Sequence, residues 1–329
     1  MDEIEVAFIG GSGLYKVPEL KNYKWVQVSS NFGLPSNKIC VGTLNKKNIA
    51  FLPRHGADHN LSPSSINYRA NIDALKKINV KNIISISAVG SLREDFAPGD
   101  IVLVDQYIDR TCKRESSFFD TDIIAHIEFS KPICENLTNI SEKILKKIGY
   151  RYHIGGTYVC IEGPQFSTLA ESNLYRSWGC DVIGMTNLPE AKLAREAGIC
   201  YLSFCMITDY DCWHPDHENV SVNQIIKVLN ENNSKGLNFI NEFTKEPEIT
   251  CNIDSHSVLK DAIISIAEWL ETNSKVFSVG KNGIVVQPTL EEKNQGAPLN
   301  LVTFSDPSGE NILKAIAEEI PEGEDQEGK

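Results

Sequence analysis

The sequence predicts an α/β fold: a mixed, largely parallel central sheet flanked by helices, with a smaller α/β extension at the C-terminal end. Short apolar runs alternate with amphipathic helical patterns along the first 247 residues. The run at residues 200–207 is almost continuously apolar, which is typical of a strand buried on both faces of a parallel sheet. Beyond residue 247 the composition becomes strongly acidic, which indicates an appended segment.

The first elements from the N-terminus are short apolar strands. We expect them at residues 6–9, 39–41 and 49–52. Residues 64–78 then carry apolar side chains at four-residue spacing, which predicts a helix that leads into a strand at 83–88.

The alternation continues through the middle of the chain. A strand at 101–108 follows the turn Pro98-Gly99-Asp100, and an amphipathic helix at 133–148 ends at Gly149. A strand at 157–161, helices near 169–178 and at 189–197, and the strand at 200–207 complete the series. Ligands of such sheets bind outside the carboxyl ends of the strands.

The C-terminal part differs in charge. Residues 248–329 hold 15 of the 44 acidic residues but only 6 of the 32 basic ones. We therefore expect a main domain over 1–247 and an extension over 248–320, with an acidic, disordered tail at 321–329. Within the extension we expect helices at 258–270 and 311–320, and strands at 276–279, 284–286 and 299–304.

Composition also excludes several classes of protein. The formal net charge of −12 disfavours nonspecific binding to nucleic acid. The nine cysteines are odd in number and never form Cys-x-x-Cys, which favours reduced thiols, with Cys200 and Cys205 filling a buried strand. The N-terminus lacks the basic residues of a signal peptide, and no apolar run reaches membrane-spanning length. We expect an intracellular protein without a membrane partner.

A glycine-rich loop follows the first strand. Gly10-Gly11-Ser12-Gly13 could bind an anion through backbone N–H groups, with Ser12 Oγ as an added donor. Lys16 stands where a third glycine would complete Gly-x-Gly-x-x-Gly, and no acid lies about 20 residues further on, so a dinucleotide site is not predicted. An ordinary tight turn fits this loop equally well.

Three further loops carry groups suited to a ligand. Arg54-His55 offers a guanidinium and an imidazole, which suit a phosphate dianion. The small residues of Ser87-Ala88 let backbone amides approach a ligand closely, and Gly163-Pro164-Gln165-Phe166-Ser167 adds an aromatic face. Taken singly, an Arg-His pair usually belongs to the protein surface, and the Ser87-Ala88 segment is equally compatible with a tight strand-to-loop bend.

Two acids, Asp209 and Asp211, follow the strand at 200–207. They would face one way if the strand pattern continued through them. Such acids can hydrogen-bond the edge of a heterocycle, and a protonated one can donate a proton to it. A solvated loop with capping aspartates is the alternative for an isolated Asp-x-Asp.

Together these segments resemble the trimeric purine nucleoside phosphorylase family, and within it the methylthioadenosine phosphorylases, from about residue 6 to about residue 243. The matching motifs are Gly10-Gly11-Ser12-Gly13-Leu14, Arg54-His55-Gly56, Asn67-Tyr68-Arg69-Ala70-Asn71, Gly90-Ser91-Leu92-Arg93-Glu94, Pro98-Gly99-Asp100, Phe118-Phe119-Asp120, Ile161-Glu162-Gly163-Pro164-Gln165-Phe166-Ser167, Met185-Thr186, Pro189-Glu190 and Thr208-Asp209-Tyr210-Asp211-Cys212-Trp213. The order of many motifs is far more specific than any one of them.

The resemblance implies a nucleoside phosphorylase-like fold and the phosphorolysis of methylthioadenosine, in purine and methionine salvage. It implies a homotrimer in the cytoplasm, with the nucleus as a second location, that needs no metal or organic cofactor. By similarity, the phosphate site would contain Ser12, Arg54, His55, Ser87, Ala88 and Thr186. Asp209 and Asp211 would be catalytic, and the other substrate contacts would come from Phe166, Ser167, Met185, Val222, Ile225 and, from a neighbouring subunit, His126.

The chain also departs from the family. Gln165 stands where these enzymes commonly have Arg, and Gly184 where Asn is common. The family's C-terminal segment, which helps to line the pocket for the 5′ group, has no recognisable match here, so the choice between a methylthio and a hydroxyl group stays open. The alternatives are a purine nucleoside phosphorylase acting on adenosine, inosine or guanosine, and an inactive relative that serves as an interaction module.

Overall fold

The computed structural model describes residues 3–10, 20–119, 124–215, 222–249, 276–280, 283–287 and 301–302. The chain divides into two compact units, one formed by Met1–Phe118 with Phe129–Ser255 and the other by Phe119–Glu128 with His256–Lys329. The expected helices at 258–270 and 311–320 and the acidic tail lie outside the described residues. The boundaries at residues 247 and 320 stay predictions.

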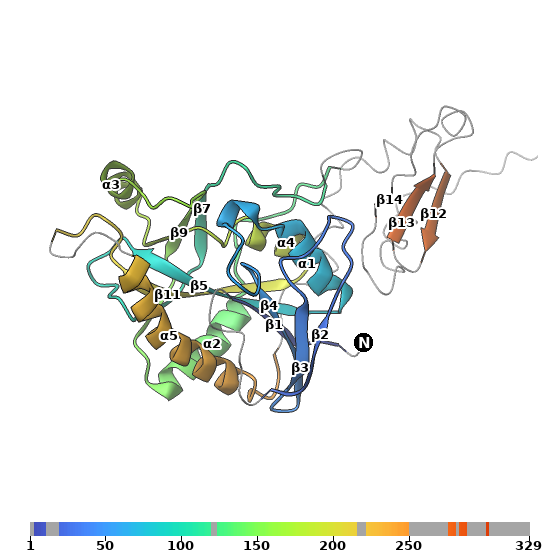
Figure 1. The fold of residues 1–329 in the computed structure, drawn as a ribbon, viewed down its shortest axis with the longest axis horizontal. Coiled ribbons are helices and arrows are strands. Elements are labelled where there is room, and N and C mark those ends of the chain that lie inside the picture. Colours follow the sequence, from blue (N-terminus) through green and yellow to red (C-terminus); the bar gives the residue numbers. More distant parts are fainter. Residues whose placement is uncertain are drawn as a thin grey trace, which may run out of the picture. The chain divides into compact units, whose positions relative to one another are not determined.

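The first unit is built on one mixed sheet (Figure 1). Its strands follow the order β2-β3-β4-β1-β5-β10-β9-β7, and β11 joins β5 to β6, which also pairs with β8. The strands are β1 (Val6–Gly10), β2 (Lys21–Val26), β3 (Ile39–Leu44), β4 (Lys47–Pro53), β5 (Asn82–Ser91), β6 (Ile101–Leu103), β7 (Gln106–Arg110), β8 (Tyr152–Ile154), β9 (Thr157–Ile161), β10 (Val182–Gly184) and β11 (Cys200–Asp209). Central pairs such as β1 with β4 and β5 with β11 are parallel, which confirms the predicted fold class.

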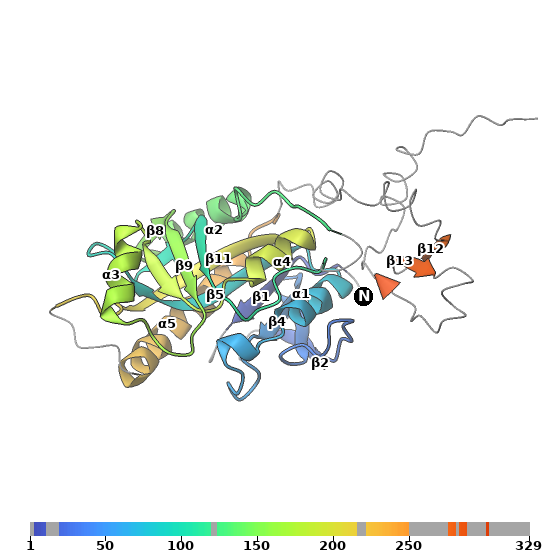
Figure 2. The same cartoon turned by 90° about the horizontal axis from the view of Figure 1, so that it is seen from above.

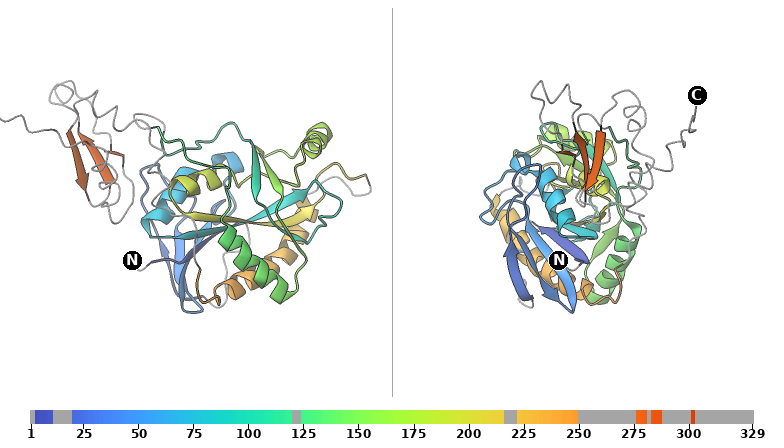
Figure 3. Two further views of the ribbon diagram at one scale, coloured as in Figure 1. Left: turned by 180° about the vertical axis from the view of Figure 1, so that it is seen from behind. Right: turned by 90° about the vertical axis from the view of Figure 1, so that its right-hand side faces the viewer.

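Helices cover both faces of this sheet because its central strands bury both sides. In β1, Ala7 and Ile9 pack into one core, whereas Val6 and Phe8 pack into the other. The first core is covered by α1 (Tyr68–Lys77) and α4 (Glu190–Glu196), the second by α2 (Glu135–Ile148) and α5 (Val222–Phe243). Figure 2 shows α1 beside α4, and the left view of Figure 3 shows α2 (green) beside α5 (orange).

The helix termini follow signals in the sequence. Asn67 Oδ1 accepts a hydrogen bond from the Ala70 N–H at 3.0 Å and so caps α1, while α2 ends at Gly149, whose φ is 73°. Thr168 and Glu171 form a capping box at the start of α3 (Leu169–Ser177). This cap fixes the backbone directly after Phe166 and Ser167.

The structure differs from the predicted elements in a few places. The strand expected at 101–108 is divided into β6 and β7, because β6 pairs with β11 and β8 whereas β7 pairs with β9. The helix expected from residue 64 begins at Tyr68, after a short 3₁₀ turn at Pro63–Ser65. Three strands were not predicted, since β2 is polar and exposed and β8 and β10 each span 3 residues.

The second unit contains an antiparallel sheet of β12 (Val276–Gly280), β13 (Gly283–Gln287) and β14 (Leu301–Val302). The strands β12 and β13 confirm the strands expected at 276–279 and 284–286. The strand β14 lies within the strand expected at 299–304.

The cysteines agree with the sequence prediction except at one position. Cys205 and six others are free thiols, but Cys200 is disulfide-bonded, so the expectation of a reduced Cys200 is wrong. Cysteines scattered along a sequence carry no local signal of which ones approach each other in the fold. Among the described helices, none is both long and apolar enough to cross a membrane.

Candidate active site

Most of the predicted site residues that the structure describes lie at one edge of the sheet. The strand β4 ends at Pro53, directly before Arg54 and His55, and β11 ends at Asp209. Both strands run parallel to the central set formed with β1 and β5, so their carboxyl ends share an edge. This is the edge at which open α/β sheets bind ligands.

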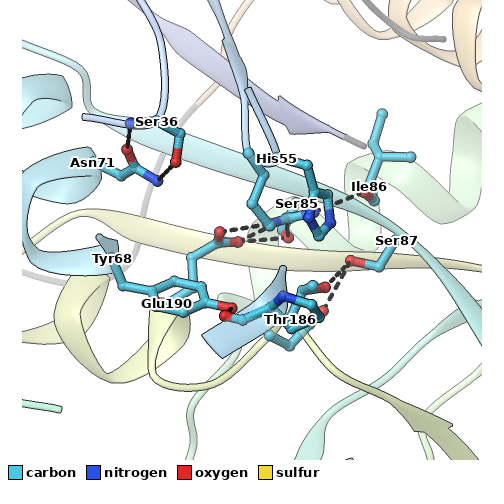
Figure 4. Close-up of polar contacts among 12 residues, drawn as sticks. Ser36, His55, Tyr68, Asn71, Ser85, Ile86, Ser87, Thr186 and Glu190 are labelled. Atoms are coloured by element: carbon cyan, nitrogen blue, oxygen red, sulfur yellow. Dashed lines mark hydrogen bonds and ion pairs between the residues drawn. The ribbon is translucent and has the colours of Figure 1, made fainter. Parts of the chain in front are cut away.

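A buried ion pair holds Arg54 in place (Figure 4). The side chains of Arg54 and Glu190 are 1% and 0% exposed, and they form a two-pronged contact, with Nε 2.8 Å from Oε2 and Nη2 2.9 Å from Oε1. Glu190 Oε1 also accepts hydrogen bonds from Ser85 Oγ at 2.7 Å and from the Tyr201 hydroxyl at 2.8 Å. The pair is neutral overall and saturated with hydrogen bonds on its carboxylate side.

This pairing limits what Arg54 can offer a ligand. Its Nη2 also donates to Ser85 Oγ at 2.5 Å, and its Nη1 donates to the Ile86 carbonyl at 3.4 Å. With the Glu190 contacts, four of the five guanidinium N–H groups are used within the described residues, which leaves one on Nη1. The two-pronged side that we expected to bind phosphate therefore faces Glu190.

His55 is held in one tautomer. Its Nδ1 lies 2.9 Å from the Leu61 carbonyl oxygen, which only accepts, so Nδ1 carries the proton and donates. Burial, together with the positive charge of Arg54, lowers the pKa of His55 to about 4. The ring is therefore neutral near pH 7, and Nε2 is the nitrogen left for a ligand.

Ser87 and Thr186, predicted to share the phosphate site, lie together although they are far apart in the sequence. Ser87 Oγ is 3.3 Å from Thr186 Oγ1 and donates to Asn187 Oδ1 at 2.9 Å (Figure 4). Ser87 and Thr186 are buried, and the adjacent Ala88 on β5 is half-buried. Asn187, which the sequence reasoning missed, fixes the Ser87 side chain.

The two acids do not follow strand alternation. Asp209 Oδ1 accepts a hydrogen bond from the Asp211 N–H at 2.8 Å, and Asp211 has a positive φ of 52°. The chain therefore turns at the end of β11, in a bend closed by an aspartate side chain. The premise that a continuing strand would aim both acids one way is wrong.

The surroundings of Asp209 raise its pKa above that of an ordinary aspartate. Burial is the main cause and the charge of Asp211 adds to it, whereas the hydrogen bonds from Thr208 and the Asp211 N–H act in the opposite direction. Thr208 Oγ1 lies 2.6 Å from Asp209 Oδ2 and 3.2 Å from the Val89 carbonyl, but one hydroxyl proton can serve only one of these oxygens. Burial also raises the pKa of Asp211.

Gly90 lets the acids approach β5. A Cβ at this position would lie 2.9 Å from Asp209 Oδ1 and 3.4 Å from Asp211 Cβ, so a larger residue would displace the acidic turn. Gly90 is three residues from Ser87 on β5, which corresponds to about 10 Å at roughly 3.3 Å per residue. The anion-side group (Arg54, His55, Ser87 and Thr186) reaches β5 at Ser87, and the acid-side group (Asp209 and Asp211) contacts it at Gly90, so these two points lie about 10 Å apart along the strand.

The loop after β9 reaches the same acidic turn. Cys212 Sγ donates to the Ser167 carbonyl at 3.4 Å, and Ser167 Oγ is buried without a hydrogen-bond partner in the described part of the chain. Such an atom is suited to a ligand. Phe166 beside it is 47% exposed, which leaves its ring open to a planar group.

The other predicted residues are not brought into this arrangement. Ser12 and the side chains of Val222 and Ile225 lie outside the described residues. His126 is exposed and belongs to the second unit, so its place relative to the site is not described. Across the described ranges, no three His, Cys, Asp or Glu side chains form a group that could hold a metal ion.

Comparison with known proteins follows the same lines. Residues 5–245 match the model of the phosphorylase superfamily. S-methyl-5′-thioadenosine phosphorylase of Rhodospirillum rubrum is 51% identical over 260 residues, or 78% of this chain and 88% of that protein. The protein of the same name from Gloeobacter violaceus is 47% identical over 271 residues, or 81% of this chain and 91% of that one.

Solved structures are also similar. A methylthioadenosine phosphorylase from an antarctic soil metagenomic library has a TM-score of 0.77 and 42% identity, covering 82% of this chain and 95% of that one. Methylthioadenosine phosphorylase from Schistosoma mansoni in complex with adenine has a TM-score of 0.70 and 32% identity. The match covers 74% of this chain and 91% of that one.

The buried ion pair leads to a prediction about stability. Glu190→Leu should lower the free energy of unfolding by about 3–5 kcal/mol, because it leaves the Arg54 charge buried without a partner. Urea unfolding followed by circular dichroism measures this change. The double variant Arg54→Met/Glu190→Leu removes both charges and should lose less than the single variant. An equal or larger loss in the double variant would contradict the assigned role of the pair.

Proposed function

Because this chain belongs to the phosphorylase superfamily, we propose that it cleaves the N-glycosidic bond of 5′-methylthioadenosine with inorganic phosphate. The products are adenine and 5-methylthioribose 1-phosphate, which makes the protein a pentosyltransferase of purine and methionine salvage. The observation that carries the proposal is that Ser87 and Gly90 lie about 10 Å apart along β5, with Thr186 beside Ser87 and the protonatable acid Asp209, on β11, paired with Gly90.

The reaction places opposite charges on the two halves of the nucleoside. As the C1′–N9 bond breaks, its electron pair moves to adenine, and C1′ gains oxocarbenium character until a phosphate oxygen bonds to it. Protonated Asp209 donates its proton to N7, which makes adenine a better leaving group. The contacts of Asp209 with Thr208 and the Asp211 N–H support this role, because they fix the carboxyl while burial favours its neutral form.

Phosphate would be held by neutral hydrogen-bonding groups more than by net charge. Arg54 is neutralised by Glu190, and His55 is uncharged near pH 7. The remaining Arg54 Nη1–H and the hydroxyl of Thr186 supply donors, and Ser87, Ala88 and Ser12 complete the proposed site. In-line positioning of phosphate at C1′ can contribute about 7–11 kcal/mol. Acid catalysis contributes roughly 10²- to 10⁴-fold, so positioning is the larger effect.

The nucleoside would lie between the two groups. Met185 would underlie the ribose, Phe166 would face the base, and Ser167 and Asp211 would meet the purine edge. The buried, unpartnered Ser167 Oγ supports this placement. Val222, Ile225 and a neighbouring subunit's His126 would surround the 5′ group in a homotrimer. We also propose that the protein acts in the cytoplasm, with the nucleus as a second location, and needs no metal or organic cofactor.

The reaction itself can be tested with the purified protein. Incubation with methylthioadenosine should release adenine only when phosphate is present, and chromatography of free base measures this. Adenosine and inosine serve as parallel substrates, since a Schistosoma mansoni relative is described as an adenosine/methylthioadenosine phosphorylase. Release of no base from any substrate would support the alternative of an inactive relative.

The role of Asp209 predicts a pH dependence. Since the raised pKa keeps the acid protonated to a higher pH than an ordinary aspartate, kcat should fall as pH rises through that value. Asp209→Asn should lower kcat by about 10²- to 10⁴-fold and remove this alkaline decrease. Steady-state rates across pH 5–9 measure both effects. An alkaline decrease that persists in the variant would assign the titration to another group.

Asp211 is expected to select adenine. A carboxylate accepts a hydrogen bond from the 6-amino group but repels the oxygen of a 6-oxopurine, and such a mismatch can cost on the order of 10⁴-fold. Asp211→Asn should therefore reduce the ratio of kcat/KM for adenosine to that for inosine. An unchanged ratio would remove Asp211 from the selection of the base.

A further inference from the structure

Arg114 lies in the loop after β7 and is buried although it carries a full charge. Its side chain is 1% exposed, and its guanidinium lies over the ring of Tyr68, 5.4 Å from the ring centre. It belongs to neither the anion-side nor the acid-side group. Its contacts instead reach the two loops that carry the proposed nucleoside contacts.

The first of these loops follows β9 and leads to Phe166 and Ser167. Arg114 Nη2 donates to the Glu162 carbonyl at 2.8 Å and to the Ile161 carbonyl at 3.4 Å, and its Nε lies 3.3 Å from Glu162 Oε1. Although burial alone would raise the pKa of Glu162, hydrogen bonds from Ser64 and the Cys112 N–H, with the charge of Arg114, hold it at about 2. The carboxylate is therefore charged at neutral pH, and the pair ties this loop to the Arg114 segment.

The second loop follows β10 and contains Met185 and Thr186. Arg114 Nη1 lies 2.7 Å from the Met185 carbonyl and 2.6 Å from the Leu188 carbonyl, both within donor distance. One planar guanidinium thus binds backbone carbonyls on both loops at once. Lysine has no such fork of donors.

The two loops also touch each other directly. A Cβ on Gly163 would lie 2.4 Å from Met185 Sδ, and Gly163 has a positive φ of 65°. The two loops are therefore in contact, with no room for a methyl group between them. A shift of one loop must then move the other.

We propose that Arg114 is a positioning residue for the nucleoside. It fixes the distance between the loop that carries Phe166 and Ser167, here called the base-side loop, and the loop that carries Met185, here called the ribose-side loop. The inference rests on the proposed function of the site. Arg54 and His55 are held separately from these loops, by Glu190 and the Leu61 carbonyl. Thr186 lies in the ribose-side loop itself, and Ser87 is held by Asn187 of the same loop. Loss of Arg114 therefore affects the nucleoside contacts of both loops but only part of the phosphate site, so it weakens nucleoside binding more than phosphate binding.

The kinetic experiment compares Arg114→Met and Arg114→Lys with Arg93→Met. Arg93 serves as a control for the loss of a paired guanidinium at the surface, where its side chain is 45% exposed. It also pairs with carboxylates, Asp95 and Asp181, and lies over an aromatic ring, but none of its described contacts reaches either loop. Arg114→Met should raise KM for methylthioadenosine by about tenfold or more and KM for phosphate by a smaller factor. The two KM values of Arg114→Lys should lie between those of Arg114→Met and those of the wild type. Arg93→Met should leave both KM values unchanged.

A role only in folding would lower the active fraction and hence the apparent kcat, with both KM values unchanged. That result in Arg114→Met, or in Arg114→Lys where the first variant does not fold, would overturn the proposal. An equal rise of the two KM values would overturn it as well.

Amide hydrogen exchange measured by mass spectrometry tests the same role without any substrate. Arg114→Lys should speed exchange in peptides covering 161–168 and 184–189 together, whereas Arg93→Met should not. Protection unchanged in both peptides would overturn the proposal. This measurement needs no turnover, so it tests the role of Arg114 even if the proposed reaction is wrong. The proposed reaction is tested separately, by the assay of the wild-type protein.

Discussion

The buried pair of Arg54 and Glu190 is the constraint on which the rest of the site depends. It joins the end of β4 to the start of α4 with two short contacts, and Ser85 and Tyr201 complete the hydrogen bonds of the carboxylate. A charge of either sign left alone in this position would be strongly destabilising, so the helix and the strand end must dock together. Docking also brings the Met185–Leu188 loop, which directly precedes α4, to the edge where Ser87 lies.

Much of the fold could be predicted because its strongest elements carry strong local patterns. The run of β11 and the four-residue spacing of α2, with Gly149 at its end, fix those elements from sequence alone. β2 could not be predicted, since an exposed polar strand has no apolar alternation. The division between β6 and β7 depends on which distant strands pair with each, and that information is not local.

The site was predictable to a similar degree. The position of Asp209 at a strand end followed from the sequence, but the turn that its own side chain closes with the Asp211 N–H did not, because Asp-x-Asp after a strand fits both a continuing strand and a capped loop. Glu190 and Arg114 act through partners that are remote in sequence: Arg54 lies 136 residues from Glu190, and Met185 lies 71 residues from Arg114. No rule of local sequence spacing predicts contacts between residues so far apart. The sequence also does not distinguish a charged residue that becomes buried from one that stays at the surface.

The strand β5 contributes to both halves of the candidate site, with Ser87 beside Thr186 and Gly90 against the acidic turn. If one residue were inserted between Ser87 and Gly90, every side chain beyond the insertion would point to the opposite face of the sheet. A residue with a side chain could then occupy the position that Gly90 leaves open for Asp209. Over evolutionary time this three-residue interval should therefore tolerate changes of side chain but not of length, whereas the surface loops can vary in both.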